Sequence, residues 1–165
     1  MISGHAAPRA LLRRLDVLAE AVDSSGLRAV LVGNAAAVLH GVPVTTHDAD
    51  FLVADGPGAR RALHDVAEHL RCTVTRPFFH AGLRWRLAGG PHAVRADFLT
   101  ALDGFRHPRG VLARAVLRAA GVRVLRVAAL EDIWVTKVAA GRPRDLETLP
   151  LIEAVLAQRL TVQPR

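Results

Sequence analysis

Asp48 and Asp50 are separated by one residue within the apolar segment 48–54, whose composition predicts a strand. Because side chains alternate between the two faces of a strand, both carboxylates are expected on one face, roughly 6–7 Å apart at the backbone. Asp97 stands in the middle of a second apolar segment, 94–99, where an acid is costly unless it is paired or binds a metal. If these strands are neighbours, three carboxylates converge, and hard oxygen ligands of this kind suit magnesium, which takes substrate phosphates as further ligands.

A glycine turn precedes the aspartates. Gly33 and Asn34 lie between the apolar segment 27–32, predicted to be a buried strand, and an alanine-rich helix over 35–40. Backbone N–H groups at a helix start bind phosphate, and glycine lets a phosphate approach closely. A phosphate-binding turn followed closely by metal-binding carboxylates is more specific than either feature alone.

The aspartates also have simpler interpretations. An Asp-x-Asp pair is often two exposed acids near the end of a strand. Arg95, on the same strand face as Asp97, is placed to pair with it in place of a metal. Both alternatives stay open at this point.

The elements that must position these residues follow from hydrophobic spacing. Helices are predicted over 9–24, 35–40, 59–70 and 130–140, and strands over 27–32, 48–54, 83–87 and 94–99. Residues 113–127 suit a hairpin about Ala120-Gly121, with a helix as the alternative. Pro143 suits a helix start, and Pro150 is expected to divide the C-terminal segment into two short helices. This order predicts an α+β fold, a small mixed sheet flanked by helices.

Composition restricts the class of protein. The chain has 165 residues, 51% hydrophobic and 22% charged, which is typical of a single globular domain with a sizeable core. Cys72 is the only cysteine, which excludes an intrachain disulfide and a multi-cysteine zinc site. Since no apolar run is long enough for a membrane helix and residues 1–9 do not resemble a signal peptide, we expect a cytoplasmic protein without a membrane partner.

The positive charge is concentrated in the middle of the chain. The formal net charge is +7, and residues 56–126 hold 13 basic and 4 acidic residues. This segment contains Arg84, Arg86, Arg106, Arg109, Arg114, Arg118, Arg123 and Arg126. They form either a solvated surface enriched by coding bias or a platform for RNA or another polyanion. Because aromatic residues are few, stacking of bases on an aromatic platform is poorly supported.

Residues 32–53, VGNAAAVLHGVPVTTHDADFLV, resemble the signature of the nucleotidyltransferase superfamily, which has the DNA polymerase β-like fold. That pattern is Gly-Gly or Gly-Ser, a short helix, His-Gly, Arg-x-Thr and then Asp-x-Asp. The segment 130–146 resembles the family's C-terminal part, a helix with a lysine, then Gly-Arg and an aspartate. The likeness is greatest to small stand-alone prokaryotic members, some of them linked to toxin–antitoxin and defence systems.

The resemblance implies one nucleotidyltransferase-like domain over 1–165, with its core at about 27–150. Asp48 and Asp50 would bind two Mg²⁺ ions together with a nucleoside triphosphate. Asp97 would complete the second metal site and help to activate an acceptor hydroxyl of RNA, a protein or a small molecule. The nucleotide-binding residues would be Gly33, Asn34, Thr46, Lys137, Arg142 and Asp145. A cognate toxin or antitoxin would be a further partner.

Several of these residues have structural alternatives. Lys137, the one lysine of the chain, suits a triphosphate contact, or its stem covers the core while its ammonium reaches solvent. Asp145 orients Lys137 or Arg142, or simply occupies the first turn of a helix. Thr46 binds a phosphate or caps a turn. For His40, at the end of a short helix, the structural role is favoured.

Two departures from the family pattern favour a non-catalytic alternative. Asn34 replaces the second glycine, and Val44 replaces the arginine that precedes the threonine. A binding protein of the antitoxin or nucleic-acid-binding type is therefore the second hypothesis. The three aspartates and Lys137 favour the enzyme.

Overall fold

The computed structural model describes residues 8–76 and 84–162. Its strands are β1 (Ala29–Val32), β2 (Ala49–Val53), β3 (Thr73–Thr75), β4 (Arg84–Gly89), β5 (Val94–Leu99), β6 (Val116–Ala120) and β7 (Arg123–Val127). They form a seven-stranded sheet in the order β3-β4-β5-β2-β1-β7-β6. The β1–β7 and β2–β5 pairs are parallel and the other pairs are antiparallel, so the sheet is mixed. The predicted α+β class with a mixed sheet is confirmed.

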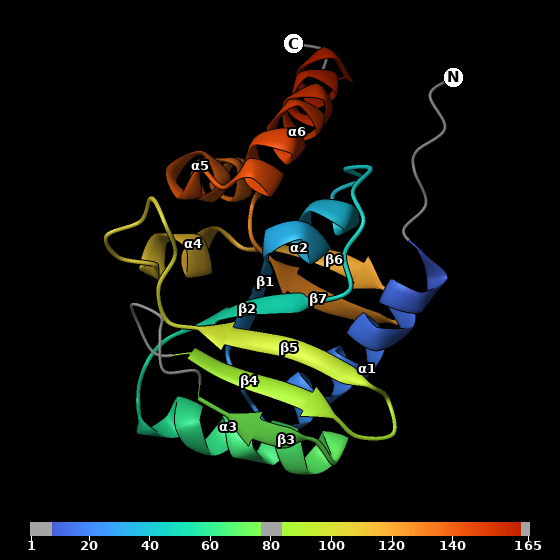
Figure 1. Cartoon of the computed structure of the whole chain (residues 1–165), viewed down its shortest axis with the longest axis vertical. Helices are drawn as coiled ribbons and strands as arrows, with labels where there is room; N and C mark the ends of the chain where they lie inside the picture. The colour runs from blue at the N-terminus through green and yellow to red at the C-terminus, as the bar shows by residue number, and fades with distance from the viewer. Residues whose placement is uncertain (1–7, 77–83, 163–165) are drawn as a thin grey trace.

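Helices lie on both sides of this sheet. They are α1 (Arg9–Ser24), α2 (Gly33–Leu39), α3 (Pro57–Leu70), α4 (Arg109–Arg114), α5 (Leu130–Ala140) and α6 (Pro143–Val162). Figure 1 shows α5 and α6 at one end of the molecule, beyond α2, and α3 at the opposite end beside β3. No helix in the described part of the chain combines the length and the apolarity needed to cross a membrane.

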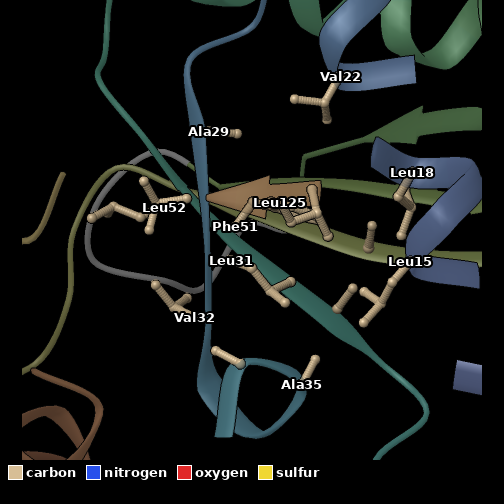
Figure 2. Packing of buried hydrophobic residues seen from close by; sticks show 14 of the residues in the cluster. Leu15, Leu18, Val22, Ala29, Leu31, Val32, Ala35, Phe51, Leu52 and Leu125 are labelled. Carbon is tan, nitrogen blue, oxygen red and sulfur yellow. The ribbon is translucent and has the colours of Figure 1, made fainter. Parts of the chain in front are cut away.

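Alternation along β2 and β5 separates the core from the polar face. Phe51 stacks on Phe98 with ring centroids 5.1 Å apart, and both rings are fully buried. They belong to one cluster with Leu15 and Leu31, residues of α1 and β1 (Figure 2). Since successive side chains point to opposite faces of a strand, Asp50 and Asp97, which directly precede these phenylalanines, project from the face opposite to the two rings.

Strand register brings two of the predicted aspartates side by side. Asp50 of β2 pairs with Val32 of β1 on one side and with Asp97 of β5 on the other. The expectation that the strands carrying these aspartates are neighbours is confirmed. Gly33 follows Val32 directly, so the start of α2 lies at the same end of β1 as Asp50.

The C-terminal segment differs from the prediction. Pro150 does not divide it into two short helices, since α6 runs without interruption from Pro143 to Val162. A proline inside a helix costs about 3 kcal/mol, because it removes one backbone hydrogen bond and crowds the preceding turn. Ile152 of α6 is fully buried and the helix packs along α5, so burial from tertiary packing outweighs this cost.

The remaining differences are at element ends. The predicted hairpin within 113–127 is present as β6 and β7, and the alternative of a helix there is wrong. The helix α2 starts at Gly33, two residues before its predicted start, and β2 starts at Ala49. Leu83, the predicted first residue of a strand, lies outside the described residues. The short elements β3 and α4 were not predicted, because three to six residues show too little periodicity.

Candidate active site

One cavity of about 620 Å³ collects every site residue proposed from the sequence. It lies where the ends of β1, β2 and β5 meet the α5–α6 junction, and its size is typical of a small-molecule site. The nine proposed residues on its lining are Gly33, Asn34, Thr46, Asp48, Asp50, Asp97, Lys137, Arg142 and Asp145. The lining also contains residues that sequence reasoning did not place in the site, among them Arg86, Asp103, Thr136 and Arg144.

The three aspartates form one side of this cavity, here termed the carboxylate wall (Asp48, Asp50 and Asp97). Asp50 and Asp97 occupy paired positions on parallel strands, so their side chains share a face. Asp48 precedes β2 by one residue, two positions before Asp50. Asp97 is buried, with 7% of its surface exposed, whereas Asp48 is exposed. The wall thus runs from a buried carboxylate to an open one.

Arginines from neighbouring strands hold the two ends of the wall. The Arg86 guanidinium donates from Nε to Oδ1 of Asp97 at 2.8 Å and from Nη2 to Oδ2 at 3.0 Å. Arg95 Nε lies 2.8 Å from Oδ1 of Asp48. The alternative in which Arg95 pairs with Asp97 is therefore wrong. Directly opposed residues on paired strands are closer than residues two apart on one strand, and Arg86 is directly opposite Asp97.

Arg86 was predicted only as part of the basic middle of the chain. A signal for its real place exists in the sequence, because Gly89-Gly90-Pro91 suggests a turn between two strands. A hairpin closed at that turn brings residue 86 opposite residue 97, as the structure shows. The Asp97 carboxylate raises the pKa of the Arg86 guanidinium, mainly by hydrogen bonding and secondly by its charge.

Gly33 provides a close approach to the wall. Its φ is +66°, a left-handed conformation that side chains rarely adopt, and a Cβ there would lie 2.9 Å from Oδ2 of Asp50. Glycine is therefore favoured by the backbone conformation, and any other residue would also displace the Asp50 carboxylate. The next residue, Asn34, has a buried Oδ1 with no hydrogen-bond partner in the described part of the chain. An unsatisfied buried acceptor costs about 1–3 kcal/mol. The Asn34 Oδ1 atom is therefore suited to accept a hydrogen bond from a ligand in the cavity.

A second part of the cavity lining, from the α5–α6 region, is the cation corner (Lys137, Arg142 and Asp145). Lys137 Nζ donates to Oδ1 of Asp145 at 3.0 Å, and Arg142 Nε donates to Oδ2 at 2.6 Å. Lys137 is only 5% exposed and Asp145 only 2%, so the lysine does not extend to bulk solvent. Burial raises the pKa of Asp145, but the bonds from Arg142 and Lys137 outweigh it, so its pKa lies below the usual value. Asp145 orients both cations and also occupies the first turn of α6.

Thr46 makes a local contact, whereas His40 joins segments that are distant in the sequence. Thr46 Oγ1 donates to the carbonyl of Asp48 at 3.2 Å and accepts from its N–H at 3.4 Å, which is the turn-capping geometry. His40 is buried away from the cavity, with Nε2 2.7 Å from the carbonyl oxygen of Ala128 and Nδ1 2.9 Å from Nη2 of Arg159. Burial lowers the pKa of His40 to about 4, so the ring is neutral and joins α6 to the segment before α5.

Much of the basic middle is engaged within the fold. Arg114 donates to both carboxylate oxygens of Asp132, at 3.2 and 2.8 Å. Arg123 lies 3.1 Å from Glu20, and Arg126 donates to the carbonyl of Leu112. The side chain of Arg84 lies outside the described residues. These contacts reduce the number of arginines available for a continuous platform.

The carboxylate wall fits magnesium by its chemistry. Among the described residues, no three His, Cys, Asp or Glu side chains already surround one point as a metal cage would require. Magnesium is usually held by one or two carboxylates together with substrate phosphates and waters, so a protein cage is not needed. Carboxylate oxygens on paired strands, beside a glycine turn with no room for a Cβ, meet this requirement.

Comparisons with known proteins point in the same direction. Residues 11–165 match the family described as "Nucleotidyl transferase of unknown function (DUF2204)". No curated protein matches the chain in sequence.

Two solved structures share the fold. A protein from Thermotoga maritima, provisionally assigned as a nucleotidyltransferase, has a TM-score of 0.66 at 16% identity, over 90% of this chain and 96% of its own. The antibiotic-resistance factor ANT(2″)-Ia, crystallised with adenylyl-2″-tobramycin, has a TM-score of 0.58 at 20% identity, over 92% of each chain. At these identities the likeness shows the fold alone.

Proposed function

Because the chain belongs to the family of nucleotidyl transferases of unknown function (DUF2204), we propose that it is a magnesium-dependent enzyme that moves a nucleoside monophosphate from a nucleoside triphosphate to a hydroxyl group. The observation that carries this proposal is that both the carboxylate wall and the cation corner line one cavity. A triphosphate needs both, since its phosphates bind cations and its metal ions bind carboxylates.

Each side of the cavity has its own task. Lys137 and Arg142 bind non-bridging phosphate oxygens, and Asp145 keeps both side chains in place. The glycine turn at Gly33 lets a phosphate approach the wall without meeting a side chain. Asp48, Asp50 and Asp97 would hold magnesium, which stabilises the attacking and leaving oxygens.

The reaction is an in-line substitution. The acceptor oxygen forms a bond to the α-phosphorus, the bond from that phosphorus to the α,β-bridging oxygen breaks, and pyrophosphate leaves. The proton of the acceptor hydroxyl is lost to solvent with the help of Asp97, the most buried member of the wall. Catalysis is mainly positioning and charge neutralisation, because the side chains form no covalent intermediate.

The acceptor is a hydroxyl of RNA, of a protein or of a small molecule, within a toxin–antitoxin or defence system. The fold neighbour ANT(2″)-Ia is known with adenylyl-2″-tobramycin, a nucleotidylated small molecule, which supports a hydroxyl acceptor. The basic segment 56–126 supports a polyanionic acceptor such as RNA.

A non-catalytic binding protein is the second candidate. It is favoured by Asn34, whose Oδ1 has no hydrogen-bond partner in the part of the chain that the structure describes, and by the Val44 side chain, which packs against the core where the family has an arginine. Such a protein would bind a triphosphate or a partner without transferring label.

Label transfer distinguishes the two candidates. The protein is incubated with Mg²⁺, each of the four α-³²P-labelled nucleoside triphosphates and cell extract, beside Asp48→Asn and Asp50→Asn. Asp55→Asn is the matched control, because Asp55 is an acid paired with Arg60 outside the cavity. Transfer that persists in the control and is lost in both cavity variants supports the enzyme. An absence of transfer together with an absence of Mg²⁺-dependent triphosphate binding contradicts it.

A further inference from the structure

Arg86 stands apart from the other cations of the cavity. It belongs to β4, on the sheet side, whereas Lys137, Arg142 and Arg144 come from the α5–α6 region. In the antiparallel β4–β5 pair it is directly opposite Asp97, so both side chains project from the same face toward the wall.

The contact between Arg86 and Asp97 restricts the carboxylate in two directions. Nε and Nη2 of one planar guanidinium bind the two different oxygens of Asp97, at 2.8 and 3.0 Å. A bidentate contact of this kind fixes the plane of the carboxylate as well as its position. An ionised carboxylate has about four acceptor positions, and the two bonds from Arg86 occupy two of them. Arg86 therefore fixes the orientation of Asp97.

Arg86 also compensates charge in the wall. Three carboxylates close together repel one another, and the Arg86 cation bound to Asp97 reduces that repulsion.

Arg95 provides a natural comparison on the same wall. Its Nε lies 2.8 Å from Oδ1 of Asp48, and the side chains of Arg95 and Asp48 are 62% and 54% exposed. In the other pair, the side chain of Arg86 is 50% exposed and the side chain of Asp97 only 9%. An exposed ion pair is weak and exchanges readily, whereas a bidentate pair with a buried carboxylate is retained.

We propose that Arg86 is a positioning residue for metal binding, which holds the Asp97 carboxylate in the orientation that a divalent cation requires. Arg95, in contrast, only neutralises Asp48 and leaves when the cation arrives. This inference rests on the proposed function, because it takes the carboxylate wall to be the metal site.

Manganese binding tests the proposal without reference to activity. The full chain is titrated with Mn²⁺ alone, and free Mn²⁺ is measured by electron paramagnetic resonance. The Arg86→Gln variant is expected to bind Mn²⁺ about 10-fold more weakly, the loss that removal of a residue behind a metal ligand commonly causes. Arg86→Lys keeps the charge but not the bidentate contact, and it is expected to stay several-fold weaker than the wild type. Arg95→Gln, the matched control, is expected to show no weakening.

The outcomes separate this inference from the proposed function. If Arg86→Gln binds Mn²⁺ as well as the wild type or better, Arg86 is a bystander or a competitor and the inference is overturned. Full affinity in Arg86→Lys overturns it too, because charge alone would then suffice. If the wild type itself binds no Mn²⁺, the proposed function falls together with the inference. Circular dichroism and thermal unfolding of each variant confirm that the affinities compared are those of folded proteins.

Discussion

The carboxylate wall and the cation corner line the same cavity but are built in opposite ways. The wall gathers three like charges, two on strands and one directly before β2, and relies on arginines of β4 and β5 for compensation. The corner is a closed group in which Asp145 pairs with both Lys137 and Arg142. Buried charge is tolerated when it is paired, whereas like charges repel unless a counter-charge is supplied. The corner is therefore complete without a ligand, and the wall is suited to receive cations.

This difference predicts separate consequences for function and for stability. Removal of a charge from the wall should reduce transfer while leaving stability nearly unchanged. Removal of a charge from the corner should destabilise the fold, since it leaves a buried ion without its partner.

The largest effect is expected from Asp50→Asn in the wall. Transfer of labelled nucleotide should fall roughly 10³-fold, since metal stabilisation of a transition state is worth several kcal/mol. The free energy of unfolding, measured with urea, should change by less than about 1 kcal/mol, because Asp50 is only partly buried and asparagine has nearly the same shape as aspartate. A variant that loses stability in proportion to its activity would show that the wall is structural.

The second effect concerns the corner. Asp145→Asn leaves Lys137 buried with a neutral partner, and the free energy of unfolding should fall by about 3 kcal/mol. The urea midpoint measures this, with Asp55→Asn as a control that keeps the wild-type value within about 0.5 kcal/mol. Equal midpoints for the two variants would contradict the view that the corner is a preassembled ion group.

The third effect is a dependence of stability on pH. The pKa of His40 is lowered to about 4, so between pH 6.5 and 4 the unfolded chain binds a proton that the folded chain does not. Stability is therefore lost as the pH falls through this range, by at most about 1.4 kcal/mol per pH unit. His40 joins α6 to Ala128, so acid should loosen the side of the cavity that carries the corner. Urea unfolding at several pH values measures the slope, which should flatten in His40→Gln.

The smallest effect is expected from Arg95→Gln at the open end of the wall. Because both partners of this ion pair are more than half exposed, the free energy of unfolding should change by less than about 0.5 kcal/mol. Thermal unfolding at low and high salt checks this. A large change would mean that Arg95, like Arg86, supports the wall.

Local patterns in the sequence were sufficient to predict most of the helices and strands. Apolar runs predicted β1, β2 and β5, and helical spacing predicted α1, α3 and α5. Pro150 misled, because its local cost was outweighed by burial of Ile152 in a helix packed on α5. That packing depends on contacts with α5, and an argument from helix propensity considers only the residues of the helix itself.

The candidate site divides along the same line. The residue types were available from the sequence, namely an Asp-x-Asp pair, a third acid in an apolar strand, a glycine turn and one lysine. The choice between Arg95 and Arg86 as the ion-pair partner of Asp97 was not fixed by the sequence, because the Gly89-Gly90-Pro91 turn suggests a hairpin without fixing its register. Cross-strand register gives Asp97 to Arg86 and Asp48 to Arg95.

The sequence by itself determined which groups this protein has for chemistry and on which elements they lie, since alternation and helical spacing are local properties of the chain. Tertiary structure alone decided that the wall and the corner line one cavity, that Gly33 leaves no room for a Cβ beside Asp50, and that Asp145 holds both cations. The physical reason is that electrostatic and steric interactions depend on distance in space, and strand pairing and helix packing set those distances.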